Sequence, residues 1–582
     1  MIFAKLDNWK DGFRHDGMLY FTQRIAEMLF HYSDHIYRTP VLNTYLLFFE
    51  YFHTVDLIKE GTINENHKKY ILDELLDSLR DDIVIRKYMD EKEIEKIIQE
   101  INSSNDFERD KVLDYLKAKI SDYDLWCKEY LRELVVEGKQ KTKINKVLKN
   151  YIPGLIEAGY DREFIYHFNE KVFVQQDVVS IDSLDVFLNR FDYCEKEYDV
   201  YIPVKKELEK FKKLFSSRFR NFEVVDKKDL PDFKYNEDKY FLVKIHVCAL
   251  EENSAAFCAF ERLNLFFRFY KFLGNNLRVL THKKGMVVNE SGEYVVVTLK
   301  KDSYSIPMLM DSKGACDIAD DLILSIYELS DSDTIDTIEK VFDLHNLAIK
   351  TGNLKNGYLN FWSIIEIVFV NNNNCTKIEN IESKLLPILQ MDYIHKLILD
   401  LEEKLDINVG NEIKTLKQSL DIKDDESFVK KALSQSITVV PVLNTDECNY
   451  KEKLYSVLTD YPILRTRYND IETIFSSKEN LKKELCRMRQ RMDWHVRRLY
   501  RTRNSIIHSG EEVHYLKDLG EHLHNYIDVF MMYILINLFN LETIDNVILD
   551  CRFKFDSIMA KVGGKGKLSV DDLNFIIKQA EF

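Results

Sequence analysis

An arginine-rich segment near the C-terminal end of this chain is the strongest constraint on its fold. Within residues 487–503 there are seven arginines and one acid, Asp493, whereas the chain of 582 residues carries a formal net charge of −15. Such a segment either forms a solvated helix face or binds a polyanion, because phosphate affinity comes from clustered Lys and Arg. The arginines are Arg487, Arg489, Arg491, Arg497, Arg498, Arg501 and Arg503.

The segment ends in residues suited to acid–base chemistry on a phosphate. The final six residues run from Arg503 through Asn504 to His508, and Gly510 follows two positions later. Histidine can both accept and donate a proton near neutral pH, and arginine stabilises charge that develops on phosphate oxygens. The amide of Asn504 can orient either partner. Gly510 is the expected cap of the helix, which places His508 in the last helical turn.

Helical periodicity groups some of these residues and separates others. At about 100° per residue, His508 lies on one stripe about 60° wide with Arg497, Arg501 and Asn504. Arg503 lies about 140° away from His508 by the same rotation, so the two converge only if the helix loosens at its end.

The end of the segment also carries a family resemblance. Four residues separate Arg503 from His508, and this motif is preceded by Leu499-Tyr500-Arg501 and followed by Ser509-Gly510. This arrangement resembles the R-x(4–6)-H signature of HEPN ribonucleases. The sequence RRLYRTRNSIIHSG, residues 497–510, looks especially like that of the Apea-like HEPN proteins of bacterial anti-phage (abortive infection) defence. The resemblance covers roughly residues 340–545.

The resemblance implies a metal-independent endoribonuclease in which two protomers bring their motifs together. The ribose 2′-OH attacks the adjacent phosphate and leaves a 2′,3′-cyclic phosphate end. By this resemblance His508 is the general acid/base, Arg503 stabilises the phosphorane and Asn504 sets their geometry. Glu366, on an earlier helix, is a candidate to orient or neutralise this cluster, although a surface or capping acid fits it equally. Arg501 is a further supporting candidate.

Binding partners follow from the same comparison. Arg497, Arg498 and Arg491 are expected to bind the RNA, which is a tRNA or an mRNA. A homodimer or higher homo-oligomer, a phage-derived trigger and no membrane are expected. No cofactor or metal is expected, since His522 and His524 are two residues apart and face different sides of a helix.

A second class of protein remains open. HEPN-like helical bundles also occur as non-catalytic RNA-binding or dimerisation modules in defence or regulatory proteins. The sequence contains no GxxxxGK[ST] motif and no paired metal carboxylates, which argues against an ATPase, a helicase or a metal-dependent nuclease.

The predicted fold is mainly α. Pro (8) and Gly (18) are sparse and apolar residues recur at helical spacing, which favours helices. Residues 240–250, 286–289 and 293–300 are instead strand-like, and 253–272 is an aromatic-striped helix. The expected organisation is an N-terminal helical domain at 1–150, a central α/β domain at 151–325, a HEPN-like helical nuclease domain at 336–545 and a C-terminal tail at 546–582.

Composition and cysteine usage indicate a cytoplasmic protein. The nine cysteines are scattered without a C-x-x-C pair, which fits free thiols in a reducing compartment. Charged residues within Met1–Asp16 exclude a signal peptide at this start. The most apolar run, Val529–Phe539, is too short to span a bilayer.

Overall fold

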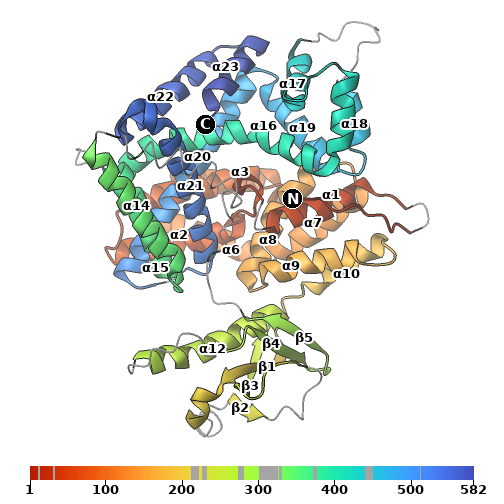
Figure 1. The fold of residues 1–582 in the computed structure, drawn as a ribbon, viewed down its shortest axis with the longest axis vertical. Coiled ribbons are helices and arrows are strands. Elements are labelled where there is room, and N and C mark those ends of the chain that lie inside the picture. Colours follow the sequence, from red (N-terminus) through yellow and green to blue (C-terminus); the bar gives the residue numbers. More distant parts are fainter. Residues whose placement is uncertain are drawn as a thin grey trace. The chain divides into compact units, whose positions relative to one another are not determined.

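The structure, a computed structural model, is mainly α with one small antiparallel sheet, which confirms the predicted fold class (Figure 1). It forms two compact units, Met1–Pro153 with Phe173–Leu184 and Tyr304–Phe582, and Gly154–Val172 with Asp185–Ser303. Each unit is described by itself. The structure describes residues 1–10, 13–30, 33–211, 222–225, 233–272, 281–299, 304, 326, 329, 331–370, 376–438, 450–511 and 513–581.

The N-terminal part of the first unit is a series of helices whose starts are fixed by polar caps. The side chains of Asn43, Asp90 and Asn105 each accept a hydrogen bond from a backbone amide that the helix leaves free. The helices are α1 (Asp16–Leu29), η1 (His35–Tyr37), α2 (Thr44–Lys59), α3 (Asn66–Asp81), α4 (Ile85–Tyr88), α5 (Glu91–Ser103), α6 (Asp106–Lys119), α7 (Tyr123–Glu137) and α8 (Lys141–Ala158).

The C-terminal part of the first unit is also helical. Its longest element, α16, begins with a capping box at Thr376 and Glu379, and it is kinked at Val409, whose φ and ψ are −142° and 33°. The helices are α14 (Ser332–Lys350), α15 (Leu354–Phe369), α16 (Lys377–Ser419), α17 (Phe428–Thr438), α18 (Tyr450–Val457), α19 (Pro462–Phe475), α20 (Lys478–His508), α21 (Leu516–Leu541), α22 (Ile544–Lys561) and α23 (Val570–Ala580).

The second unit is built on a five-stranded antiparallel sheet in the order β2-β3-β1-β4-β5. Helix α12 packs on one face, where Ala259 and Leu263 meet Val200 and Val243 in a fully buried core (Figure 1). The elements in or next to this unit are α9 (Arg162–Asn169), η2 (Glu170–Val174), α10 (Ile181–Arg190), β1 (Lys196–Lys205), η3 (Lys206–Phe211), β2 (Phe222–Val225), β3 (Tyr240–Ala249), α12 (Glu252–Phe272), β4 (Lys284–Asn289) and β5 (Tyr294–Thr298).

A buried ionic cluster links helix α1 of the N-terminal part to helices α16 and α19 of the C-terminal part within the first unit. The guanidinium of Arg467 on α19 pairs with Glu27 on α1 and with Asp400 on α16, the latter at 2.6 Å. It also lies 3.5 Å from the ring centroid of Tyr37. The three charged side chains are at most 5% exposed. The segments expected as 1–150, 336–545 and 546–582 therefore lie in one compact unit.

One finding concerns membranes. In the described part of the chain, no single helix is long and apolar enough to cross a bilayer. Among the described residues, α21 and α22 taken together are long and apolar enough, but they form a pair bent by 103°.

Helices α1 and α7 approach so closely that only glycine fits between them. A Cβ on Gly17 would lie 2.6 Å from both the Cα of Gly138 and the carbonyl oxygen of Val135. Gly17→Ala should therefore destabilise the protein by about 1–3 kcal/mol, because overpacking outweighs the gain in helix propensity. Thermal unfolding followed by circular dichroism measures this. Gly410→Ala in α16, where no atom lies within 4 Å, is the control and should be neutral or slightly stabilising.

Candidate active site

The arginine-rich segment is a single continuous helix, α20, which runs to His508 without interruption. The side chain of Ser477 caps its first turn, and Ser509 ends it one residue before the predicted cap. Gly510 follows with a φ of +67°, a conformation that glycine adopts at little cost. The ammonium of Lys355 donates a hydrogen bond of 2.9 Å to the Gly510 carbonyl, which fixes the helix end against α15.

Two arginines of α20 are buried against acids from the N-terminal helices. Arg498 donates to Glu50 at 2.8 Å and to Glu74 at 2.7 Å, and Arg501 donates to Glu50 at 2.5 Å. Burial opposes ionisation of Glu50, but the two guanidiniums outweigh it and hold the pKa of that carboxyl below its usual value. At Glu74 burial prevails and raises the pKa. These contacts attach α20 to α2 and α3.

A third arginine is buried on the same helix. Arg497 donates to Glu382 of α16 at 2.5 Å and lies 3.5 Å from the ring centroid of Tyr70. Its Nε is also 3.3 Å from Asp493. Burial and the neighbouring Asp493 carboxylate raise the pKa of Glu382 to about 9.

These positions correct part of the predicted site. Arg497, Arg498 and Arg501 are 6%, 4% and 4% exposed, and their guanidiniums face carboxylates inside the protein. Arg497 and Arg498 are therefore not available to RNA phosphates in this structure, and Arg501 does not reach the surface next to His508. Of the three arginines expected to bind RNA, Arg491 alone is exposed.

Arg491 lines a cavity of about 210 Å³ between α3, α8 and α20. Burial and nearby guanidiniums lower the pKa of Lys149, in the same wall, to about 7. Asp77 and Asp81 line the cavity as well, so its charge is mixed.

The structure brings three of the predicted site residues together. Arg503, with 22% of its side chain exposed, donates from Nη1 to Oδ1 of Asn504 at 2.9 Å. Its Nη2 lies 3.5 Å from Oε1 of Glu366. Helix α15 presents Glu366 in this position because Tyr358 donates a 2.8 Å hydrogen bond to the Leu499 carbonyl of α20. The Arg503 guanidinium is thus held from two sides and remains open on a third.

His508 is exposed at the end of the same helix but does not share a face with Arg503. The helix stays regular through His508, so the two side chains are about 140° apart in rotation and about 7.5 Å apart along the axis. The loosening of the helix end that would bring the two residues together within one chain does not occur.

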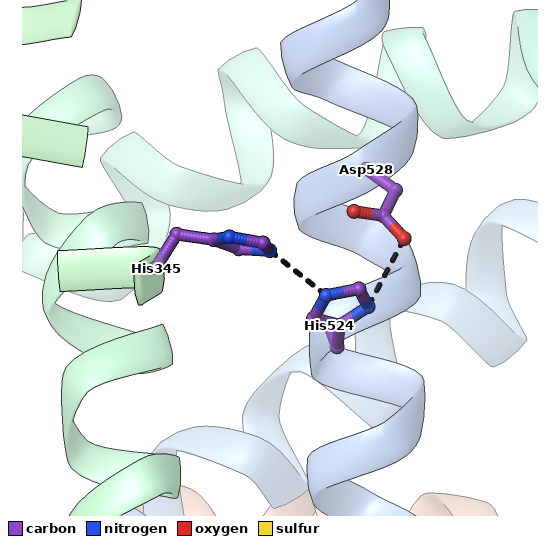
Figure 2. A group of neighbouring side chains, drawn as sticks. All are labelled: His345, His524 and Asp528. Carbon is purple, nitrogen blue, oxygen red and sulfur yellow. Dashed lines mark hydrogen bonds and ion pairs between the residues drawn. The ribbon is translucent and has the colours of Figure 1, made fainter. Parts of the chain in front are cut away.

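The sequence did not predict two clusters of histidines that the structure contains. His522 and His524 do face different partners, as expected. His522 Nδ1 lies 3.2 Å from Nε2 of His495. His524 Nε2 lies 2.9 Å from Nε2 of His345, and its Nδ1 lies 3.0 Å from Asp528 (Figure 2). The four-residue spacing of His524 and Asp528 is a signal in the sequence, whereas His345 is 179 residues away and gives none.

Comparison with known proteins adds no relative. Protein-family models, curated proteins and solved structures were each searched, and none matches this chain.

The ion pairs of α20 predict a large contrast between its arginines. Arg498→Ala should destabilise the protein by about 3–5 kcal/mol, because Glu50 and Glu74 lose a buried partner. Arg487→Ala, which removes an exposed pair with Asp81 at 3.9 Å, should cost at most about 1 kcal/mol. Denaturant unfolding of the full chain measures both. Equal losses in the two variants would contradict the structural role assigned to Arg498.

Proposed function

We propose that this protein is a metal-independent endoribonuclease of the HEPN type, acting in bacterial anti-phage (abortive infection) defence. The observation that supports it is the arrangement of Arg503. Asn504 and Glu366 hold its guanidinium, yet part of it stays accessible at a helix end that also exposes His508. An arginine with only a structural role on this helix has different surroundings, since Arg498 is nearly fully buried between two carboxylates.

Each residue has a role in transesterification of RNA. His508 accepts the proton of the ribose 2′-OH or donates one to the leaving 5′-oxygen, because imidazole titrates near neutral pH. Arg503 binds the non-bridging oxygens of the phosphorane through its planar fork. Asn504 and Glu366 fix the orientation of that fork. The products carry 2′,3′-cyclic phosphate and 5′-hydroxyl ends.

The geometry of α20 favours a site assembled from two protomers. In one regular helix Arg503 and His508 point about 140° apart, so a single chain presents them to different directions. A two-fold contact between helix ends would place His508 of one protomer near Arg503 of its partner, and isologous contacts are the commonest route to such pairing. RNA, either tRNA or mRNA, is the proposed substrate.

A second candidate function is a non-catalytic RNA-binding or dimerisation module in a defence or regulatory protein. The burial of Arg497, Arg498 and Arg501 favours the dimerisation form of this candidate, because arginines that form ion pairs inside the fold do not bind RNA phosphates. Replacement of His508 distinguishes the two functions, since a binding module does not depend on a titrating imidazole.

Three substitutions test the proposed roles. His508→Ala should abolish cleavage, and Arg503→Ala should lower the rate by about 10²–10³-fold, by analogy with loss of an oxyanion donor. Glu366→Gln should lower it roughly tenfold, equivalent to about 1.4 kcal/mol, because the guanidinium loses a charged partner. Single-turnover cleavage of labelled RNA, with analysis of the product ends, measures all three.

His514→Ala is the matched control, because His514 is an exposed histidine six residues beyond the motif. Its cleavage rate should equal that of the wild type. Full activity of His508→Ala, with unchanged product ends, would reject the role assigned to His508. RNA binding by the wild type without any cleavage would reject the nuclease and leave the binding module.

Metal and salt dependence separate this mechanism from a metal nuclease. Cleavage should persist in EDTA, because no step is assigned to an ion. RNA affinity should fall as salt rises, and Arg491→Ala should reduce the slope of log affinity against log salt by about one. Restoration of cleavage by Mg²⁺ after chelation would reject the proposal. Titrations at several salt concentrations give the slope.

A further inference from the structure

We propose that His345, His524 and Asp528 form a binding site for a divalent transition-metal ion that links α14 to α21. This site is separate from the chemistry assigned to the end of α20. His345 comes from α14, and the other two residues lie one turn apart on α21.

The three side chains converge closely. The Nε2 atoms of His345 and His524 are 2.9 Å apart, and Nδ1 of His524 is 3.0 Å from Oδ2 of Asp528 (Figure 2). One ligand atom from each residue lies within 4.8 Å of the others. Two imidazole nitrogens therefore face each other, and the carboxylate lies behind one of the two rings.

An ion fits between the two imidazoles with little movement. Two nitrogens bound tetrahedrally at 2.0–2.1 Å from zinc are about 3.3 Å apart, so the rings need to separate by only about 0.4 Å. Without an ion, His345 donates its Nε2 proton to Nε2 of His524, whose Nδ1 proton goes to Asp528. For an ion to bind, that proton leaves Nε2 of His345 and the ring takes the Nδ1–H tautomer through exchange with solvent, while the hydrogen bond from His524 to Asp528 stays intact.

The carboxylate completes the arrangement found around metal-bound imidazoles. Asp528 accepts from Nδ1 of His524, which fixes the tautomer with Nε2 unprotonated and facing His345. Imidazole ligands suit Zn²⁺, Ni²⁺ and Cu²⁺, whereas Mg²⁺ and Ca²⁺ require oxygen ligands. The site is therefore assigned to the zinc and nickel class, with water in the remaining positions.

Access and shielding are also suitable. His524 is 4% exposed, whereas His345 and Asp528 are partly exposed, so an ion enters from the His345 side. The ring of Phe361 packs on the cluster, 5.1 Å from His524 and 6.1 Å from His345 between centroids. This apolar wall limits water on one side of the ligands.

The neighbouring pair His495 and His522 provides an internal comparison. Its two nitrogens are 3.2 Å apart, but the other nitrogen of His495 faces the hydroxyl of Tyr526 instead of a carboxylate. On His495, a hydroxyl therefore stands where Asp528 stands behind His524.

The test uses the full chain, treated with EDTA, dialysed and titrated calorimetrically with ZnCl₂ alone. The wild type should bind one ion per chain, and its Tm should rise with Zn²⁺ concentration. His345→Ala should lose this binding. Asp528→Asn should weaken it by about 10–100-fold, the usual effect of losing a carboxylate behind a ligating histidine. His522→Ala, two residues from His524, is the matched control and should bind as the wild type does.

Circular dichroism spectra establish that each variant is folded, and Co²⁺ absorption gives the ligand geometry independently of calorimetry. Absence of stoichiometric binding by the wild type would overturn the proposal. Equal affinity in the wild type and His345→Ala would do so too, as would a loss in His522→Ala that matches the loss in Asp528→Asn.

Discussion

The first unit depends on ion pairs between arginines of α20 and acids that lie far away in the sequence. Glu50 receives both Arg498 and Arg501, and Glu74 and Glu382 receive Arg498 and Arg497. Burying these charges costs desolvation energy, so such pairs are weak evidence for net stability. Their effect is on specificity, because any other arrangement of α2, α3 and α16 around α20 leaves a buried charge without a partner. The ion pairs of α20 thus determine how the N-terminal and C-terminal helices pack around it.

One helix consequently has two chemical environments. Its middle is enclosed by carboxylates, whereas its last turn carries the partly exposed Arg503 and the exposed His508. The enclosed part fixes the direction of the exposed part, because α20 is continuous between them. Glu366 and Lys355 of α15 then hold the helix end from the side. A site on a rigid element of this kind keeps its geometry better than one on a loop.

Sequence patterns predicted the helices and strands better than they predicted which residues contact each other. Helix α12 and strands β3, β4 and β5 fall where spacing and β-branched residues placed them, and Glu366 lies 3.5 Å from the Arg503 guanidinium. Strand β1 was not expected, although it lies at the centre of the sheet order.

The arginine stripe shows the limit of such patterns most clearly. Its helical spacing is the same whether the stripe faces RNA or faces Glu50, which is 451 residues from Arg501. Periodicity identifies which residues share a face, but not which distant element covers that face. The sequence did not predict the pairing of His345 with His524 for the same reason, since only tertiary packing brings α14 to α21.

The separation of Glu50 and Glu74 from their arginines has a consequence for synthesis of the chain. The two acids leave the ribosome more than 400 residues before Arg498, so the N-terminal helices cannot reach their final packing until α20 has emerged. A chain that stops short of α20 lacks both the motif and the charges that its own N-terminal part requires. The polypeptide therefore matures as a whole, and incompletely translated chains present neither a finished fold nor the proposed active site.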